Sequence, residues 1–380
     1  MAETTARSGL TPQQWDDEFF TEYVRQNRFA RYMGTDEFSM IHAKDDLTRK
    51  PGDKITFAAA RSLGGGVTGN QVLEGNESEL DTRSKTVTVA PLRNAVVVTE
   101  WDEQKSAIDL RNAGRSALKV WAMERMREDV IGAFKSVPNA AGVMVPWETA
   151  TAAERNAWMV ANADRVQFGI DVANASSGVV ATALATIDNT NDKLSAAMIT
   201  KAKRRAQTAR PRMQPIRVGP GDQEWYVLFC NPMSFRDLQN DTTIAQANRD
   251  ARVRGLDNPI FTGDSLVYDG VIIREIPEMG LPFAASATSV GQVGGILAGA
   301  GSGGIDVGFN FLCGAQAIGM GWARRTRSTT DVRDYGFRNG VGVMEVRGIE
   351  KLMFGTGVND TDTLVQNGVY TLFAAAAADA

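Results

Sequence analysis

The sequence predicts an α+β protein, and three observations lead to this fold class. Residues 102–135 carry no proline and repeat apolar side chains at helical spacing, which predicts one helix about 45 Å long. Residues 51–94 contain two stretches of alternating apolar and polar residues, typical of strands, separated by a long loop. Prolines at positions 211, 215 and 220 mark a boundary, after which strand-like and helix-like patterns follow one another.

The predicted long helix has the features of a structural spine. Its apolar positions include Leu118, Ala122 and Met126. A row of basic residues, Arg111, Arg115 and Lys119, follows the same helix at intervals of four. Like charges at this spacing destabilise an isolated helix by about 0.2–0.5 kcal/mol per pair. The row therefore forms either a solvated face or a surface that meets acidic residues supplied from elsewhere.

The two predicted strands span residues 54–58 and 84–90, and the loop that connects them is acidic. It contains glycine clusters and little apolar sequence, so it cannot form a core of its own. Loops longer than about 15 residues inside a compact domain are usually functional or disordered. The candidate contact residues in this loop are Glu74, Glu77, Glu79 and Asp81.

The N-terminal region, residues 1–50, carries a narrow aromatic stripe. Trp15, Phe19 and Tyr23 recur at intervals of four in a segment that is rich in acidic residues. Two interpretations stay open: an ordinary core helix, or an arm that lies on another surface.

The rest of the sequence predicts further helices and strands on both sides of the boundary at residues 211–220. We expect helices over residues 152–163, 196–208, 232–238 and 245–254, and strands over 95–99, 225–230, 271–276 and 341–348. A tight turn is expected at 268–270. The alanine-rich end of the chain is expected to be a frayed tail.

Composition narrows the function classes. The 380 residues predict two domains, or one domain with large extensions, and the net charge of -4 disfavours broad binding of nucleic acid. Cys230 and Cys313 lie in apolar sequence, which predicts buried, reduced thiols and fits a cytoplasmic origin. We expect a soluble protein, because the sequence shows neither a signal pattern nor an apolar run long enough to span a membrane.

Signals for catalysis are weak. The single histidine, His42, has no nearby serine or cysteine signature, and one histidine cannot make a two-histidine metal site. The glycines of residues 299–304 formally match a dinucleotide-binding pattern, but that pattern needs a strand before it and a helix after it. We interpret the match as chance, and we expect no enzyme activity, cofactor or metal.

Four short stretches carry a resemblance to a known family. They are residues 162–169 (Asn-Ala-Asp-Arg-Val-Gln-Phe-Gly), residues 258–263 with 268–273, residues 314–317, and residues 334–336 with 348–351. The predicted elements also follow one another in the order arm, hairpin and spine helix. By these stretches and this order, the sequence resembles the major capsid proteins of tailed bacteriophages, most closely those of N-four-like phages.

The resemblance implies the Hong Kong-type capsid fold. In this frame residues 1–50 are the N-terminal arm and 51–94 the extended loop called the E-loop. Residues 95–220 are the peripheral domain, with its spine helix at 102–135, and residues 221–335 are the axial domain. Residues 336–356 return to the peripheral domain, and residues 357–380 form the C-terminal tail.

The resemblance also implies function and partners. It implies a homo-oligomeric shell protein that forms hexamers and pentamers around the phage genome, in the virion after assembly in the host bacterial cytoplasm. We expect the acidic loop to contact Arg111, Arg115 and Lys119 of a neighbour. A separate scaffolding protein, a portal, a decoration protein and loose contact with packaged DNA are further expected partners. An encapsulin-like compartment and a nucleotide-binding α/β enzyme are the alternatives.

Overall fold

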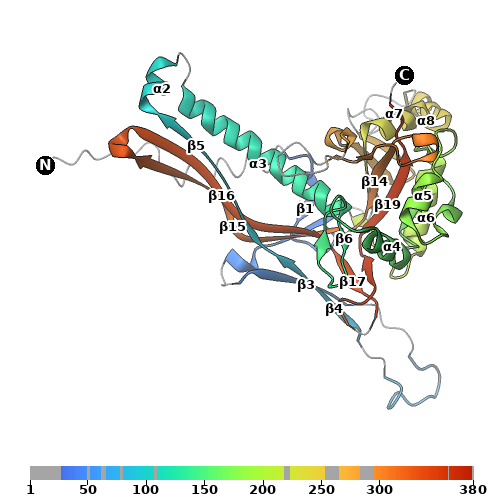
Figure 1. Ribbon diagram of the computed structural model, residues 1–380. Helices are drawn as coiled ribbons and strands as arrows, with labels where there is room; N and C mark the ends of the chain where they lie inside the picture. Colours follow the sequence, from blue (N-terminus) through green and yellow to red (C-terminus); the bar gives the residue numbers. More distant parts are fainter. Residues whose placement is uncertain are drawn as a thin grey trace.

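A long, narrow sheet and a second, broader sheet organise the chain in the computed structural model (Figure 1). The structure describes residues 27–48, 52–60, 66–77, 80–106, 109–217, 223–252, 265–282, 294–357 and 359–378. The long sheet has the strand order β1-β2-β15-β16-β5. Its strands are β1 Met33–Gly34, β2 Ile41–Lys44, β15 Ile318–Arg333, β16 Arg338–Lys351 and β5 Ala90–Thr99.

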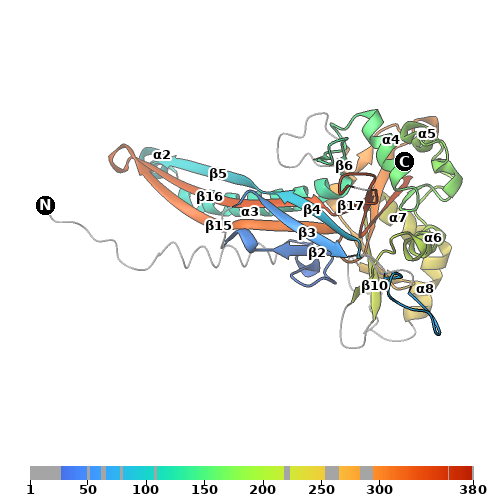
Figure 2. The same cartoon turned by 90° about the horizontal axis from the view of Figure 1, so that it is seen from below.

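The helix α3, Leu110–Lys135, lies along one face of the long sheet (Figures 1 and 2). A Cβ added to Gly114 would lie 3.2 Å from the Val96 side chain, so glycine lets helix and sheet approach closely at this position. Val341 and Val343 of β16 are buried, because alternate residues of a strand point to the same face. Leu118, Ala122 and Met126 of the helix belong to the same hydrophobic core.

The predicted single helix over 102–135 is wrong at its start. The chain instead forms a short helix, α2 Glu100–Lys105, and then begins α3 at Leu110. The Asp109 side chain caps the new helix by accepting hydrogen bonds from the backbone of Arg111 at 3.1 Å and of Asn112 at 3.0 Å. An aspartate that satisfies the first N–H groups of a helix favours a helix start at this position. The spine is therefore 26 residues long, about 39 Å.

The second sheet has eight strands in the described residues, with the main order β11-β12-β10-β14-β19-β8. These strands are β11 Ser265–Tyr268, β12 Val271–Glu275, β10 Glu224–Cys230, β14 Val307–Cys313, β19 Val369–Ala375 and β8 Val166–Phe168. In addition, β9 Ile216–Arg217 pairs with β10, and β13 Ile296–Leu297 pairs with β14. Helices gather around this sheet (Figure 1). They are α4 Ala152–Ala161, α5 Val180–Ala185, α6 Ala196–Thr208, α7 Pro232–Asn240 and α8 Thr242–Arg252.

The prediction of a frayed C-terminal tail is wrong. Strand β19 lies between β14 and β8, and Ala374, Ala375 and Ala376 are buried. A strand that is covered on both faces needs small or apolar side chains throughout, so the alanines fill a core position here. Residues 318–333 also differ from expectation. They form β15, which pairs with β16 in the long sheet, whereas we expected them in the axial domain.

The acidic loop begins and ends in a two-stranded hairpin, β3 Lys54–Ala60 and β4 Thr82–Thr88. The second predicted strand therefore begins two residues earlier than expected, and Ala90 already belongs to β5. Short strands and turns complete the described chain: β6 Val137–Pro138, β7 Met144–Val145, β17 Met353–Gly355, β18 Leu364–Gln366, and the 3-10 helices η1 Ala30–Tyr32, η2 Asp46–Thr48, η3 Val172–Ala175, η5 Pro277–Gly280, η6 Ser302–Gly304 and η7 Asp334–Gly336.

Several local predictions are confirmed. The helix expected over 196–208 is α6, and the helix expected over 152–163 is α4 with a capping box at Thr151 and Glu154. Asp269 and Gly270 have positive φ angles of 47° and 70°, which suit a two-residue hairpin turn between β11 and β12. Trp15, Phe19 and Tyr23 lie outside the described residues. Residues 27–44, expected in the arm, contact the chain's own core, where Phe29 is buried.

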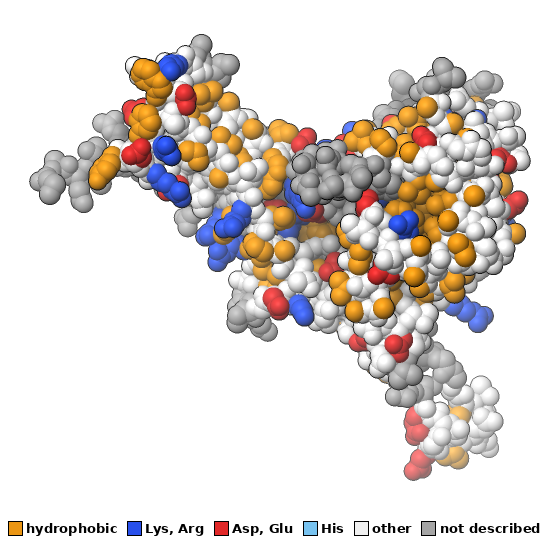
Figure 3. All heavy atoms as spheres, viewed as in Figure 1, with side chains coloured by type: hydrophobic (Ala, Val, Ile, Leu, Met, Phe, Trp, Pro, Cys, Tyr) orange, Lys and Arg blue, Asp and Glu red, His pale blue; other side chains and the backbone are white. Residues whose placement is uncertain are grey.

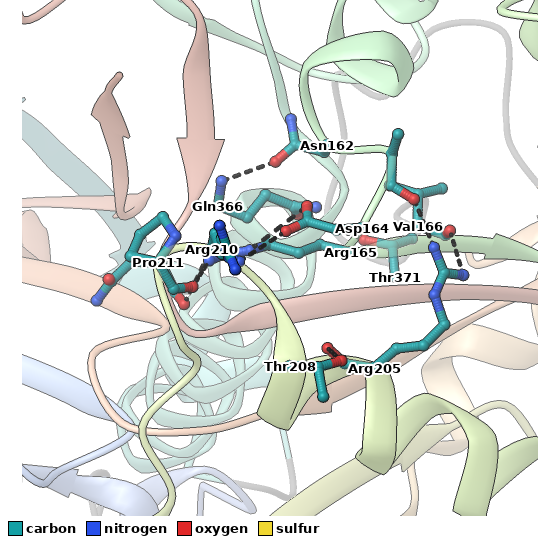
Figure 4. A network of polar contacts seen from close by, with 12 residues as sticks. Asn162, Asp164, Arg165, Val166, Arg205, Thr208, Arg210, Pro211, Gln366 and Thr371 are labelled. Atoms are coloured by element: carbon teal, nitrogen blue, oxygen red, sulfur yellow. Dashed lines mark hydrogen bonds and ion pairs between the residues drawn. The ribbon is translucent and has the colours of Figure 1, made fainter.

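The stretch at residues 162–169 contacts three other segments of the chain through side-chain hydrogen bonds (Figure 4). The buried Arg165 donates hydrogen bonds to the carbonyl oxygens of Pro211 and Asn367. Asn162 accepts from the backbone of Gln366 at 2.8 Å. Arg205 of α6 reaches the carbonyl oxygens of Ala163 and Val166. Because these side chains satisfy buried backbone groups, the stretch is structural.

Candidate assembly surfaces

The acidic loop projects away from both sheets (Figure 1). Glu74 and Glu77 are exposed, and Glu77 accepts a hydrogen bond from the backbone of Gly75 at 2.8 Å. Val72 and Leu73 expose 68% and 57% of their surface, which is high for aliphatic side chains. The loop thus offers apolar and acidic groups together, and a partner would bury both (Figure 3).

The two remaining candidate residues of the loop lie differently. Asp81 is half-buried and forms an ion pair with Arg83 at 2.8 Å, so its charge is already matched within the chain. Glu79 lies outside the described residues.

The root of the loop is fixed on the body of the molecule. Ile55, Phe57 and Val87 of the hairpin form a small core with Leu352 and Phe354.

Polar contacts hold the same root. The Ser84 hydroxyl donates to Asp360 at 2.5 Å, and Lys85 pairs with Glu350 at 3.2 Å. A fixed root sets the direction in which the loop extends.

The basic row of α3 is present as predicted. Arg111, Arg115 and Lys119 are half-buried, and Arg115 donates to the Asn112 side chain at 3.2 Å. The row lies in the first turns of α3, whereas the acidic loop extends from the opposite end of the molecule (Figures 1 and 2). The acidic loop therefore does not reach the row of its own chain.

A groove of about 870 Å³ lies on the face of the long sheet away from α3. Its lining includes Gly340 and Gly342, which have no side chain to fill it. The exposed Arg93, Arg333 and Arg338 line it. Sequence reasoning missed this groove, although alternation along β16 places its glycines opposite Val341 and Val343.

The tip of the long sheet exposes an apolar patch. Its members are Val97, Trp101, Val332, Tyr335 and Phe337. Trp101 is 55% exposed and Val332 is 60% exposed, and the patch lies far from the second sheet (Figure 3). Contiguous exposed apolar residues of this kind mark surfaces that contact other proteins.

A buried ionic network joins α3 to the long sheet, and sequence reasoning missed it. Arg347 of β16 contacts Glu345 at 2.6 Å and Asp129 of α3 at 2.8 Å, and Arg125 contacts Asp129 at 3.1 Å. Thr326 donates to Glu345 at 2.7 Å. Burial raises the pKa of Asp129 above its usual value, while Arg347 opposes this shift.

Two lysines lie at the C-terminal end of α3. Lys135 contacts Glu148 and the carbonyl oxygen of Gly294, both at 2.6 Å. Lys351 donates to the carbonyl oxygen of Phe134 at 3.2 Å, and burial lowers its pKa to about 7. A cationic Lys135 at this end suits the helix dipole.

The residues considered above for catalysis or nucleotide binding are His42, the two cysteines and the loop at 299–304. His42 is half-buried beside Phe57, and its Nδ1 lies 3.2 Å from the carbonyl oxygen of Asp36. Cys230 and Cys313 are free and buried, as predicted, and burial raises both thiol pKa values, which disfavours the reactive thiolate. Residues 299–304 lead into strand β14 and not into a helix, so the dinucleotide geometry is absent from this loop.

The described part of the chain contains no group of three or more His, Cys, Asp or Glu side chains placed to hold a metal ion. No helix among the described residues is long and apolar enough to cross a membrane. The described chain thus carries an extended acidic loop, basic residues on α3 and along the groove, and an exposed apolar tip.

Comparison with known proteins identifies the family. The family model for phage capsid protein matches residues 3–375, and the chain belongs to this family. It is 28% identical to the major capsid protein of Pseudomonas phage KPP25 over 376 residues, which covers 95% of this chain and 94% of that protein.

Solved capsid structures share the fold. The capsid of cyanophage Pam1 matches with a TM-score of 0.79 and 32% identity, over 100% of both chains. The capsid of Ralstonia phage GP4 matches with a TM-score of 0.69 and 21% identity, over 100% of this chain and 96% of that chain. The Hong Kong-type fold is confirmed, and the chain is a phage major capsid protein that forms the capsid shell.

Proposed function

We propose that this chain assembles as hexamers and pentamers into an icosahedral shell in which the acidic loop of one copy lies on a basic surface of its neighbour. The observation that carries this proposal is the loop itself. It exposes Val72, Leu73, Glu74 and Glu77 away from any surface of its own chain (Figure 1). Such a segment gains stability by burying its side chains on another copy.

Two basic surfaces fit this loop. The row of Arg111, Arg115 and Lys119 on α3 is the first candidate from the sequence. The groove on the long sheet is the second, and its glycine lining leaves room for a loop backbone between arginines. Exposed ion pairs contribute only about 0–1 kcal/mol each, but a shell repeats each pair in every subunit.

Charge reversal tests the pairing and separates the two surfaces. Arg115→Glu should lower the yield of shells if the α3 row receives the loop, and Arg93→Glu should do so if the groove does. Adding Glu74→Lys and Glu77→Lys to the sensitive variant should restore assembly, because the opposite charges face each other again. Sedimentation at low and high salt measures the yield. If both single variants assemble like the wild type at each salt concentration, the loop pairing is wrong.

Other partners belong to the same proposal. A separate scaffolding protein would guide assembly in the host bacterial cytoplasm, and a portal and a decoration protein are further candidate partners. The net charge of -4 supports loose, non-specific contact with packaged DNA. We assign no catalytic role to the chain. Reconstitution with and without scaffolding protein, followed by electron microscopy, tests the dependence on scaffold.

A further inference from the structure

Strand β15 contains more residues than the stretch of β16 with which it pairs. Trp322 lies opposite Arg347, and Arg327 lies opposite Met344. The register shifts twice within this interval, once before and once after Arg324. A strand that places an extra residue against a single partner residue forms a β-bulge. Residues 322–327 therefore contain two successive bulges, which we call the double bulge.

The burial of side chains along β15 agrees with the double bulge. In a regular strand, residues 322, 324 and 326 would point to the same face. Trp322 and Thr326 are 3% and 5% exposed, whereas Arg324 between them is exposed. Ala323 and Arg325 have no partner in the ladder, so they are the two extra residues.

Only one strand is lengthened at this place. On the other side of β16, strand β5 pairs in a single register from Thr99 opposite Arg338 to Ala90 opposite Arg347. Two extra residues add up to about 7 Å of chain to β15. A bulged strand bends and twists more strongly than its partner. Figure 1 shows that β15 and β16 change direction between the tip of the long sheet and the second sheet.

The long sheet is well supported on both sides of the double bulge. The base of the sheet, residues 318–322 and 347–351, is joined to β2, which pairs with β15 over residues 318–321. A Cβ added to Gly321 would lie 2.8 Å from the Ile55 side chain, so the base also packs closely on the loop root. On the tip side, Val341 and Val343 share a core with Leu118 of α3.

The buried ionic network lies directly under the double bulge. Thr326 donates to Glu345 at 2.7 Å, and Arg347 contacts Glu345 at 2.6 Å. Arg347 also contacts Asp129 of α3 at 2.8 Å. These contacts join β15, β16 and α3 at the bend. Because hydrogen bonds and close ion pairs need a defined geometry, the network holds the bend at one angle.

We propose that the double bulge fixes the angle between the base and the tip of the long sheet, and that this angle sets the curvature of the shell. The tip exposes Trp101 and Val332, so it is a surface that a neighbouring copy can cover. A copy whose tip points in another direction must place its neighbours differently. The inference rests on the proposed assembly, because curvature arises only between copies.

Deleting the extra residues tests whether the double bulge sets the angle. Deletion of Ala323 leaves one bulge, and deletion of Ala323 with Arg325 leaves a regular ladder that still points Trp322 and Thr326 inward. Spin labels on Val332→Cys at the tip and Thr182→Cys on α5, both at exposed positions, report the angle in unassembled subunits. The native cysteines are buried, so they should not be labelled. Double electron–electron resonance should show a shifted label distance after the single deletion and a larger shift after the double deletion.

Arg325→Ala is the matched control for these deletions. It removes the ion pair with Asp45 that the double deletion also removes, but it keeps both bulges. Its label distance should equal that of the wild type. Deletion variants that fold, as judged by circular dichroism, and keep the wild-type distance would overturn the role of the double bulge.

Electron microscopy of assembled protein tests the link to curvature. The particle diameter should change in the same order as the label distance, from wild type to the single and then the double deletion. A changed label distance with an unchanged diameter would overturn this link. Wild-type protein that forms no shells would contradict the proposed assembly, while the label distances would still decide whether the double bulge sets the angle.

Wild-type shells provide a measurement that does not depend on the folding of the deletion variants. A fixed angle requires the same backbone bend at residues 322–327 in every copy, in pentamers and in hexamers. Electron cryomicroscopy that finds one bend throughout the shell would support the proposal. Copies that differ in their bend at these residues would overturn it.

Discussion

The Ser84 hydroxyl donates a hydrogen bond of 2.5 Å to the Asp360 carboxylate, across 276 residues of sequence. The same carboxylate accepts from the Ser84 backbone at 3.3 Å, and these bonds lower the pKa of Asp360. The contact joins the root of the acidic loop to the turn before β18. A direction fixed at the root makes the loop ready to reach a neighbour without a large ordering cost.

Removing this contact should loosen the loop root. Ser84→Ala deletes one hydrogen bond to a charged group at an exposed position, so we expect a local loss of about 1 kcal/mol. Amide hydrogen exchange in β4 should rise several-fold, while exchange in β19 should not change. Thr86→Ala on the exposed face of the same strand is the control. Equal exchange in both variants would show that the Asp360 contact does not hold the root.

The buried network around Arg347 should be costly to break. Arg347→Met leaves the buried Glu345 carboxylate without its cation, which costs about 3–5 kcal/mol of the free energy of unfolding. The control is Arg333→Met, because that side chain is 79% exposed and its ion pair with Asp331 contributes little. Urea denaturation of unassembled subunits measures both. Similar stability of the two variants would contradict the role of the network.

Lys351 predicts a pH dependence of stability with a defined sign. Its pKa is about 7 in the folded chain, against 10.5 without burial, so the folded state releases a proton that the unfolded state retains. The free energy of unfolding should therefore rise as pH increases from about 7 to 10, by up to about 1.4 kcal/mol per pH unit. Lys351→Met should remove this rise. Urea denaturation at pH 7, 8 and 9 measures the free energy of unfolding. If this free energy changed equally with pH in the wild type and the variant, the prediction would be contradicted.

The end of the chain should be essential for folding. Ala375→Asp would bury a carboxylate at the end of β19 in the second sheet, where the wild-type side chain is 0% exposed. Burying an unpaired charge strongly destabilises a fold, so we expect no folded subunit. Ala378→Asp, at an exposed position three residues later, should fold like the wild type. Circular dichroism shows whether each variant is folded. A folded Ala375→Asp variant would contradict the strand assignment.

Local patterns predicted much of the fold. The helix over 196–208 and the turn at 268–270 could be predicted because capping residues and turn chemistry act over a few residues. The break before α3 was missed, because the helical periodicity continues across it while Asp109 supplies a new cap. Strand β19 was missed because its alanines resemble a flexible tail until β14 and β8 are known to enclose them.

The candidate surfaces were predicted only in part. The acidic loop and the basic row are visible in sequence because each is a local cluster of charge. The network of Arg347 and Asp129 joins residues 218 apart, so the sequence could show only that Glu345 and Arg347 continue the strand face of Val341 and Val343. The groove depends on strands that meet in three dimensions, and no local pattern reports it.

Electron cryomicroscopy of assembled shells tests the central claim most directly, because it can trace the loop between subunits. The account predicts that residues 66–81 of each copy extend onto a neighbouring copy, with Glu74 and Glu77 within hydrogen-bond distance of its arginines or lysines. A shell in which this loop folds back onto its own chain, or extends into solvent without contacting another copy, would contradict the account.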